Sequence, residues 1–237
     1  MRKKLIISIV LVLVVVAGLL YCSGLGNTIM GVIGWGEIEN AEDVVIVLDA
    51  GHGGMDPGKV GIHDEKEKDI NLSIIYKLKE LLEDNDVKII LTREGDDGLY
   101  TQEDKNKKKA DLNKRLDIID NSGALLVVSI HQNAYPSQDV HGAQVFYQEK
   151  SPVGRQLAQC VQTELINGLD KENTRQIKGN GSYYLLKKSQ IPMILVECGF
   201  LSNDEEATLL SSEEYQDKIA KCVSDGIVKY INESVLQ

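Results

Sequence analysis

The chain has 237 residues and a formal net charge of −10 at pH 7, from 26 Lys and Arg against 36 Asp and Glu. Binding to phosphate backbones without regard to sequence needs an excess of basic side chains, so this balance argues against nucleic acid as a partner. The four cysteines include no CxxC pair, which excludes a cysteine zinc site. Cys160 and Cys222 fall on apolar faces of predicted helices, and we interpret them as buried small side chains rather than as part of a disulfide framework.

The first 22 residues have the pattern of a targeting segment. A basic start, Met1–Lys4, precedes an almost wholly apolar run, Leu5–Tyr21. This run is long for a signal-peptide core and short for a membrane span, so a cleaved signal peptide and an N-terminal membrane anchor both remain open. Either alternative puts the rest of the chain outside the cytoplasm, because basic residues stay on the cytoplasmic side. Residues 23–43 are predicted to be a tether to a domain that spans residues 44–237.

The first half of this domain alternates buried strands with amphipathic helices. A strand that is buried on both faces has a continuous apolar, β-branched run, whereas a surface helix repeats apolar residues every three or four positions. By these criteria the predicted elements are, in chain order, the strand Val44–Leu48, the helix Glu67–Glu83, the strand Val87–Leu91, a helix with its core at Leu112–Ile119 and the strand Ala124–Ile130. The highly charged stretch 95–109 is predicted to be an exposed loop or the solvated start of a helix.

The second half adds further strands and two long helices. The predicted elements are the strand Ala143–Tyr147, the helix Pro152–Leu169, the strands Tyr183–Leu186 and Met193–Val196, and the helix Ser212–Ile231. Strands that alternate with helices are typical of parallel sheets. We therefore expect a single α/β domain in which a mostly parallel, six-stranded sheet is flanked by helices.

Three titratable residues stand at the ends of predicted strands, where open α/β sheets place their ligands. His52 follows the first strand, His131 follows the third directly, and Glu197 ends the last. Burying a carboxylate is costly without a cation or hydrogen-bond donors, and a metal ion would satisfy Glu197. Either histidine alone could equally be a hydrogen-bonded core residue, but two at strand ends favour a metal site. His63 and His141 lie in polar loops and are predicted to be exposed.

The charged segment Asp64–Asp69 is typical of a solvated helix start, and if it supplies a third metal ligand, spacing alone does not choose between Glu65 and Glu67. Two imidazoles and one carboxylate would leave a fourth position open, which distinguishes a catalytic zinc site from a structural one. A nearby glutamate that is not a ligand, here Glu197, could then act as general base in amide hydrolysis. The sequence has no GxSxG motif and no Cys–His nucleophile arrangement. The glycine loop after the first strand, Gly51–Gly54, lacks the Lys and Ser/Thr of a phosphate-binding loop.

Six short motifs between residues 44 and 232 resemble those of the zinc-dependent N-acetylmuramoyl-L-alanine amidases, and they occur in the same order. The motifs are Val47–Gly54, Glu67–Leu72, Leu91–Arg93, Arg115 with Asn121, Ser129–Ala134 and Val196–Asn203. The resemblance implies that His52, Glu67 and His131 bind zinc, which resolves the choice between Glu65 and Glu67, and that Glu197 is the catalytic carboxylate. It also implies cleavage between the lactyl group of N-acetylmuramic acid and the first L-alanine of the stem peptide in peptidoglycan.

The length, the leader and the lack of a separate wall-binding domain are similar to the germination-specific members of that family. This likeness implies action on spore cortex, in the formation of muramic-δ-lactam. Some related amidases carry an inhibitory helix after the second histidine motif, but only about 20 residues separate His131 from the predicted helix at Pro152. We therefore expect control by expression or by another protein.

Two other functions remain as alternatives. One is a zinc carboxypeptidase or aminopeptidase of similar fold, and the other is a membrane-anchored wall-binding module without catalysis. The first should show a further group for a peptide terminus, and the second should lack one of the four site residues. Arg93 and Arg115 have acidic neighbours such as Asp96 and Asp117, so we predict structural ion pairs rather than substrate contacts for them.

Overall fold

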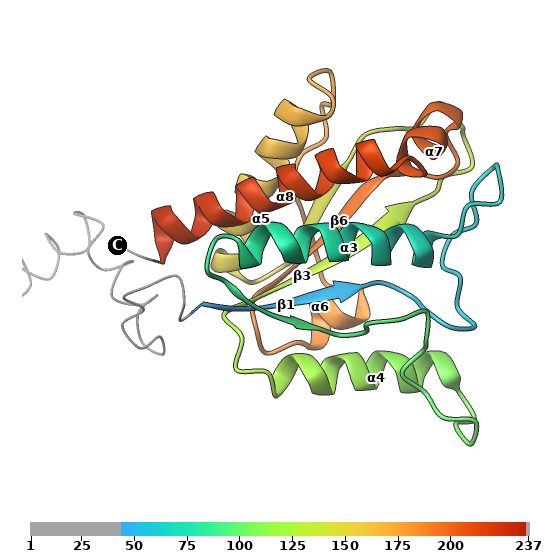
Figure 1. Ribbon diagram of the computed structural model, residues 1–237, viewed down its shortest axis with the longest axis vertical. Helices are drawn as coiled ribbons and strands as arrows, with labels where there is room; N and C mark the ends of the chain where they lie inside the picture. Colours follow the sequence, from blue (N-terminus) through green and yellow to red (C-terminus); the bar gives the residue numbers. More distant parts are fainter. Residues whose placement is uncertain (1–43, 236–237) are drawn as a thin grey trace, which may run out of the picture. The chain divides into compact units, whose positions relative to one another are not determined.

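The computed structural model describes residues 44–235, and the predicted targeting segment and tether lie outside these residues. Within them, no helix combines the length and the apolar character that crossing a membrane requires. The described residues form one α/β domain around a six-stranded sheet (Figure 1). This confirms the predicted fold class.

The sheet has the strand order β2-β1-β3-β6-β4-β5. Strands β2, β1, β3 and β6 run parallel to one another, while β4 pairs with β6 in the antiparallel direction and with β5 in the parallel direction. The strands are β1 (Val45–Ala50), β2 (Lys88–Leu91), β3 (Leu126–Asn133), β4 (Gln144–Gln148), β5 (Lys178–Asn180) and β6 (Met193–Phe200). The carboxyl ends of β1, β3 and β6 therefore meet at one edge.

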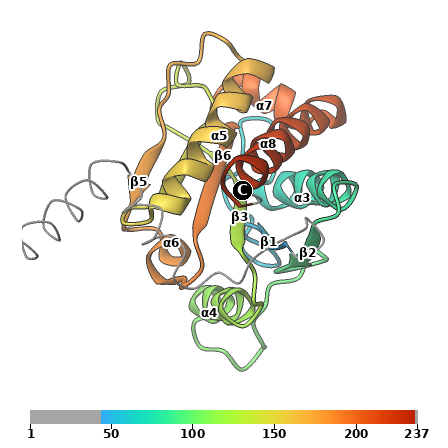
Figure 2. The ribbon, with the colours of Figure 1, turned by 90° about the vertical axis from the view of Figure 1, so that its left-hand side faces the viewer.

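Helices cover both faces of the sheet. Figure 2 shows α3, α5 and α8 on one face and α4 and α6 on the other. The helices are α3 (Glu67–Glu83), α4 (Lys107–Asp120), α5 (Pro152–Gly168), α6 (Tyr184–Lys188), α7 (Asp204–Leu210) and α8 (Glu213–Ser234). Helix α5 begins with Pro at its first turn and with a Ser151 cap that accepts a hydrogen bond from Gly154 N.

Alternation along the strands decides which residues reach the face under α4 and α6. Val47, Val127 and Leu195 belong to the buried cluster of that face, together with Leu185 of α6. Because successive side chains of a strand point to opposite faces, residues two positions further along point the same way. Asp49, Ser129 and Glu197 therefore lie on this face, as does His131, which pairs with Glu197 across β3 and β6.

One predicted strand is wrong, and two elements were not predicted. Tyr183–Leu186 is not a strand, because Tyr184–Lys188 forms the short helix α6, whose Leu185 and Leu186 pack into the core. Short apolar runs do not distinguish a strand from a buried helical turn. The sixth strand is instead β5, whose Lys-Gly-Asn sequence carries no apolar signal, and the short helix α7 was also missed.

Several predicted boundaries also move. Strand β6 continues to Phe200 and β3 continues to Asn133, so Glu197 and His131 lie within strands rather than at their ends. Residues 134–143, between β3 and β4, contain no helix. Of the cysteines in the described part of the chain, all three are free; Cys198 and Cys222 are buried, whereas Cys160 is half-buried.

Candidate active site

The four predicted site residues converge at the carboxyl edge of the central strands. His52 lies in the loop after β1, His131 in β3 and Glu197 in β6. Glu67 is the first residue of α3, which brings its carboxylate across the edge from the opposite face. Ligand atoms of His52, Glu67 and His131 all lie within 4.8 Å of one another.

The carboxylate of Glu67 is the centre of this cluster. Its Oε1 lies 3.2 Å from His52 Nε2 and 2.9 Å from His131 Nδ1, and it accepts a hydrogen bond from Gln132 N. Its Oε2 accepts a hydrogen bond of 2.6 Å from Lys59 N. Burial would raise the pKa of Glu67, but the hydrogen bonds from the two histidines lower it well below the ordinary range. The side chain is therefore held as a buried carboxylate.

The residues that the sequence left ambiguous or assigned to the surface lie elsewhere. Glu65 turns back to its own loop, where its Oε2 accepts a hydrogen bond from His63 N. His63 and His141 are exposed, as predicted. Glu67 rather than Glu65 thus joins the two histidines at the strand edge.

The backbone around His52 is specialised for close packing. His52 has a φ of 64°, a left-handed conformation that is unusual for a residue with a side chain. Its neighbour Gly51 lies against the ring of His131, and a Cβ at this position would collide with that ring. Such conformations persist only where surrounding contacts hold them, and they gather at functional sites. Here Arg115 Nη2 donates a hydrogen bond to the carbonyl of His52.

Glu197 differs from Glu67 in its partners. It is 7% exposed, and its Oε2 is a buried atom with no hydrogen-bond partner among the described residues. Burial raises the pKa of Glu197 to about 7. A group that titrates near neutrality can take up and release a proton at physiological pH.

Asp49 and Arg115 form a buried ion pair beneath the cluster. Arg115 Nη1 lies 2.7 Å from Asp49 Oδ1, and Arg115 Nε lies 2.6 Å from Asp111. The expected structural ion pair of Arg115 is therefore confirmed, but its partners are Asp49 and Asp111 rather than the neighbouring Asp117. The helical register of α4 turns Arg115 into the core, where it is 1% exposed.

Arg93 is also buried and makes no pair with Asp96, contrary to prediction. Its guanidinium donates hydrogen bonds to the backbone carbonyls of Ala50 at the end of β1, Gly51 in the loop that follows and Lys68 in the first turn of α3. Asp96 pairs instead with the ammonium of Lys68, at 2.6 Å. Arg93 thus joins the start of α3 to the glycine loop without using a carboxylate.

Asp56 and Lys108 are two site residues that sequence reasoning missed. Asp56 Oδ2 lies 3.0 Å from His52 Nδ1 and 3.2 Å from Lys108 Nζ. The ring of His52 is therefore fixed from both sides, with Nδ1 on Asp56 and Nε2 facing Glu67. The signal was an aspartate four residues after a candidate ligand, since metal-binding histidines commonly place their second nitrogen on a carboxylate.

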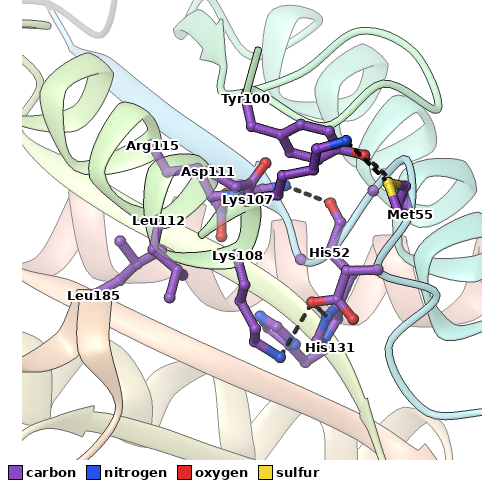
Figure 3. A pocket seen from close by; sticks show the side chains of 14 residues that line it. His52, Met55, Tyr100, Lys107, Lys108, Asp111, Leu112, Arg115, His131 and Leu185 are labelled. Carbon is purple, nitrogen blue, oxygen red and sulfur yellow. Dashed lines mark hydrogen bonds and ion pairs between the residues drawn. The ribbon is translucent and has the colours of Figure 1, made fainter. Parts of the chain in front are cut away.

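A cavity of about 300 Å³ opens beside the two histidines. Figure 3 shows His52 and His131 together with side chains from α4 and from the loop that precedes it. Leu112 and Leu185 give this cavity an apolar wall, and Lys107 and Lys108 give it a basic one. Its size suits part of a peptide rather than a single water molecule.

Comparison with known proteins agrees with this geometry. A family model described as N-acetylmuramoyl-L-alanine amidase matches residues 46–229. The germination-specific N-acetylmuramoyl-L-alanine amidase of Bacillus subtilis is 40% identical over 192 residues, which make up 80% of this chain and 80% of that protein.

Solved structures of similar fold are also amidases. The CwlD amidase from Clostridioides difficile, determined in complex with the GerS lipoprotein, is 45% identical with a TM-score of 0.78, over 80% of this chain and 99% of that one. AmiC2 of Nostoc punctiforme, an N-acetylmuramoyl-L-alanine amidase, is 32% identical with a TM-score of 0.70, and the match covers 82% of this chain and 99% of that one. These matches favour the amidase over the peptidase and the inactive-module alternatives. The chain therefore belongs to the N-acetylmuramoyl-L-alanine amidase family and is a hydrolase that acts on peptidoglycan.

Proposed function

We propose that His52, Glu67 and His131 hold a zinc ion and that Glu197 is the general base for hydrolysis of the amide bond between N-acetylmuramic acid and L-alanine. The observation that carries this proposal is the convergence of three ligand atoms within 4.8 Å, beside a glutamate with an unpartnered buried oxygen. Two imidazole nitrogens and one carboxylate oxygen are the donors of catalytic zinc sites, which keep one position open.

The residues present fit a cation in three respects. When the neutral His52 ring carries its proton on Nδ1, where Asp56 accepts it, the lone pair of Nε2 faces the cluster. His131 turns Nδ1 toward Glu67 Oε1, the carboxylate oxygen that His52 Nε2 also faces. A cation among these atoms lets both imidazoles stay neutral while it compensates the charge of the buried Glu67.

The chemistry then divides between the metal and the chain. A bound zinc ion supplies Lewis-acid polarisation of the scissile carbonyl and lowers the pKa of water. Glu197 accepts the proton of the attacking water on its buried carboxylate and returns it to the nitrogen of the leaving L-alanine. The pairing of β3 with β6 holds Glu197 beside His131 on a stiff support, and enzymes rely on such positioning for much of their rate.

The relatives support a proposal for the biological setting. We extend to this chain the germination role of the Bacillus subtilis protein, with spore cortex as the peptidoglycan substrate and an extracytoplasmic location. The leader at residues 1–22 would serve as a signal peptide or an anchor. Because the Clostridioides difficile relative was determined with a lipoprotein, a lipoprotein partner is also part of the proposal. Residues 134–143 lack an inhibitory helix, which supports control by such a partner.

Mass spectrometry of muropeptides tests the reaction. The zinc-loaded full chain should release stem peptides with a free N-terminal L-alanine from purified cortex peptidoglycan and leave an unsubstituted lactyl group on the glycan. A chelator should abolish this release and added zinc should restore it. Peptides cut elsewhere in the stem would instead identify a peptidase.

A further inference from the structure

The cavity beside the histidines extends well beyond the residues proposed to carry the chemistry. Its far wall is built by Met55, by Tyr100 from the loop before α4, and by Lys107 in the first turn of α4. Figure 3 shows Tyr100, Lys107 and Met55 grouped together, away from His131. Met55 N donates a hydrogen bond to the Tyr100 hydroxyl, which ties the glycine loop to this wall.

The cations that line this cavity differ in their partners. Arg115 pairs with Asp49 and Asp111, and Lys108 pairs with Asp56 at 3.2 Å. In these pairs the carboxylates compensate the positive charges of Arg115 and Lys108. Lys107 is the exception.

Among the described residues, the direct contacts of the Lys107 ammonium are all with neutral groups, and the carboxylate of Asp104 interacts with it only at longer range. Its ammonium donates to Gln102 Oε1 at 3.0 Å, lies 3.6 Å from Met55 Sδ and stands 5.3 Å from the centre of the Tyr100 ring. Within residues 44–235 it makes no ion pair with a carboxylate, although the chain has 36 acidic residues against 26 basic ones. A half-buried cation that no described carboxylate contacts directly, in the wall of the reaction cavity, is available to an anionic substrate group.

We infer that Lys107, with Tyr100 and Met55, forms a subsite for a carboxylate of the stem peptide. The inference rests on the proposed function, because the scissile bond has to lie at the His52–Glu67–His131 cluster for the peptide to run along the cavity. Beyond its first L-alanine the stem carries an acidic residue, whose carboxylate suits a single lysine. A phosphate of a wall polymer would call for several converging donors. Tyr100 and Met55 offer apolar surface to the aliphatic part of the same residue.

A pair of synthetic substrates tests this subsite. Both are N-acetylmuramoyl-L-alanyl-γ-D-glutamyl peptides, one with the glutamyl α-carboxylate free and the other with it amidated. The zinc-loaded full chain is compared with Lys107→Met, which removes the charge and keeps the length, and with Lys107→Arg, which keeps the charge. Lys109→Met is the matched control, because Lys109 lies in the same helical turn but outside the cavity lining.

Lys107→Met should raise KM for the free carboxylate by about tenfold, the range of a partly exposed charge-assisted contact, and leave kcat nearly unchanged. KM for the amidated substrate should not change, Lys107→Arg should restore most of the preference, and Lys109→Met should resemble the parent. Equal effects on both substrates, or none, would overturn the subsite.

The proposed function can fail separately. If the parent chain cleaves neither substrate, the proposed reaction is wrong, and equilibrium binding of the two peptides to the parent and to Lys107→Met still decides the subsite. Tighter binding of the free carboxylate that is lost in Lys107→Met supports it. Equal binding of both peptides refutes it.

Discussion

Two buried carboxylates on the same face of the sheet differ in their hydrogen-bond partners. Asp49 in β1 has both oxygens satisfied, by Arg115 and by the hydroxyls of Thr92 and Ser129. Glu197 in β6 has a buried oxygen, Oε2, to which no described residue donates a hydrogen bond. Burial alone would raise the pKa of each, but Arg115 and the hydroxyls lower that of Asp49 to about 2, whereas the pKa of Glu197 rises to about 7.

This difference distinguishes a carboxylate with a structural role from one that can exchange a proton. A carboxylate that is fully paired keeps its charge at any physiological pH and fixes the groups around it. A carboxylate left partly unsatisfied is costly to the fold and remains free to exchange a proton. Asp49 thus holds Arg115, and through it the carbonyl of His52, while Glu197 remains available to a substrate.

The largest expected effect is loss of stability when the paired carboxylate is removed. Asp49→Asn leaves the buried Arg115 without its main counter-ion, which should lower the free energy of unfolding by about 3–5 kcal/mol. Urea unfolding of the full chain measures it. Asp111→Asn is the control, because Asp111 contacts Arg115 from a more exposed position and should cost less. Equal costs would mean that burial does not set the strength of this pair.

The same pair predicts a pH dependence. The pKa of Asp49 is lower in the folded chain than its ordinary 3.8, so its stabilisation is complete above about pH 5 and is lost as pH falls toward 2. That shift corresponds to about 2 kcal/mol. The stability difference between the parent and Asp49→Asn should therefore narrow by about this amount between pH 6 and pH 2. A constant difference would contradict the lowered pKa.

A smaller effect is expected next to the His52–Glu67–His131 cluster. Asp56→Ala removes the acceptor that orients His52 Nδ1, and the loss of such a partner weakens metal binding by about 10- to 100-fold. Competition with a zinc chelator measures the affinity independently of activity. Lys108→Met, which keeps the contact between Asp56 and His52, should change it much less. Unchanged zinc affinity in Asp56→Ala would show that His52 needs no such support.

Residue patterns predicted the strands and helices that position the site, because buried parallel strands and amphipathic helices have distinct periods. They failed at Tyr183–Leu186, where four apolar residues fit a strand and a helical turn equally well. Three of the four proposed site residues, His52, His131 and Glu197, were predicted because titratable groups interrupt apolar runs at strand ends, whereas the choice of Glu67 came from the family resemblance.

What the sequence did not predict depends on how loops and separate elements fold against one another. Arg115 pairs with Asp111 four positions earlier, but its fully buried partner is Asp49, 66 positions away. The partner of the His52 ring, Asp56, is close in sequence but meets it only because the glycine loop folds back. Neither contact follows from periodicity or composition, since each depends on how separate elements pack.

The most direct test compares two glutamates in one experiment, with zinc content and muropeptide release measured on the same preparations. Glu197→Gln keeps the shape of the side chain but cannot accept a proton, so it should retain one zinc per chain while turnover falls on the order of a hundredfold or more. Glu67→Gln should instead lose zinc. Full activity in Glu197→Gln, or loss of zinc from it while Glu67→Gln keeps the metal, would contradict the assignment of base and ligand.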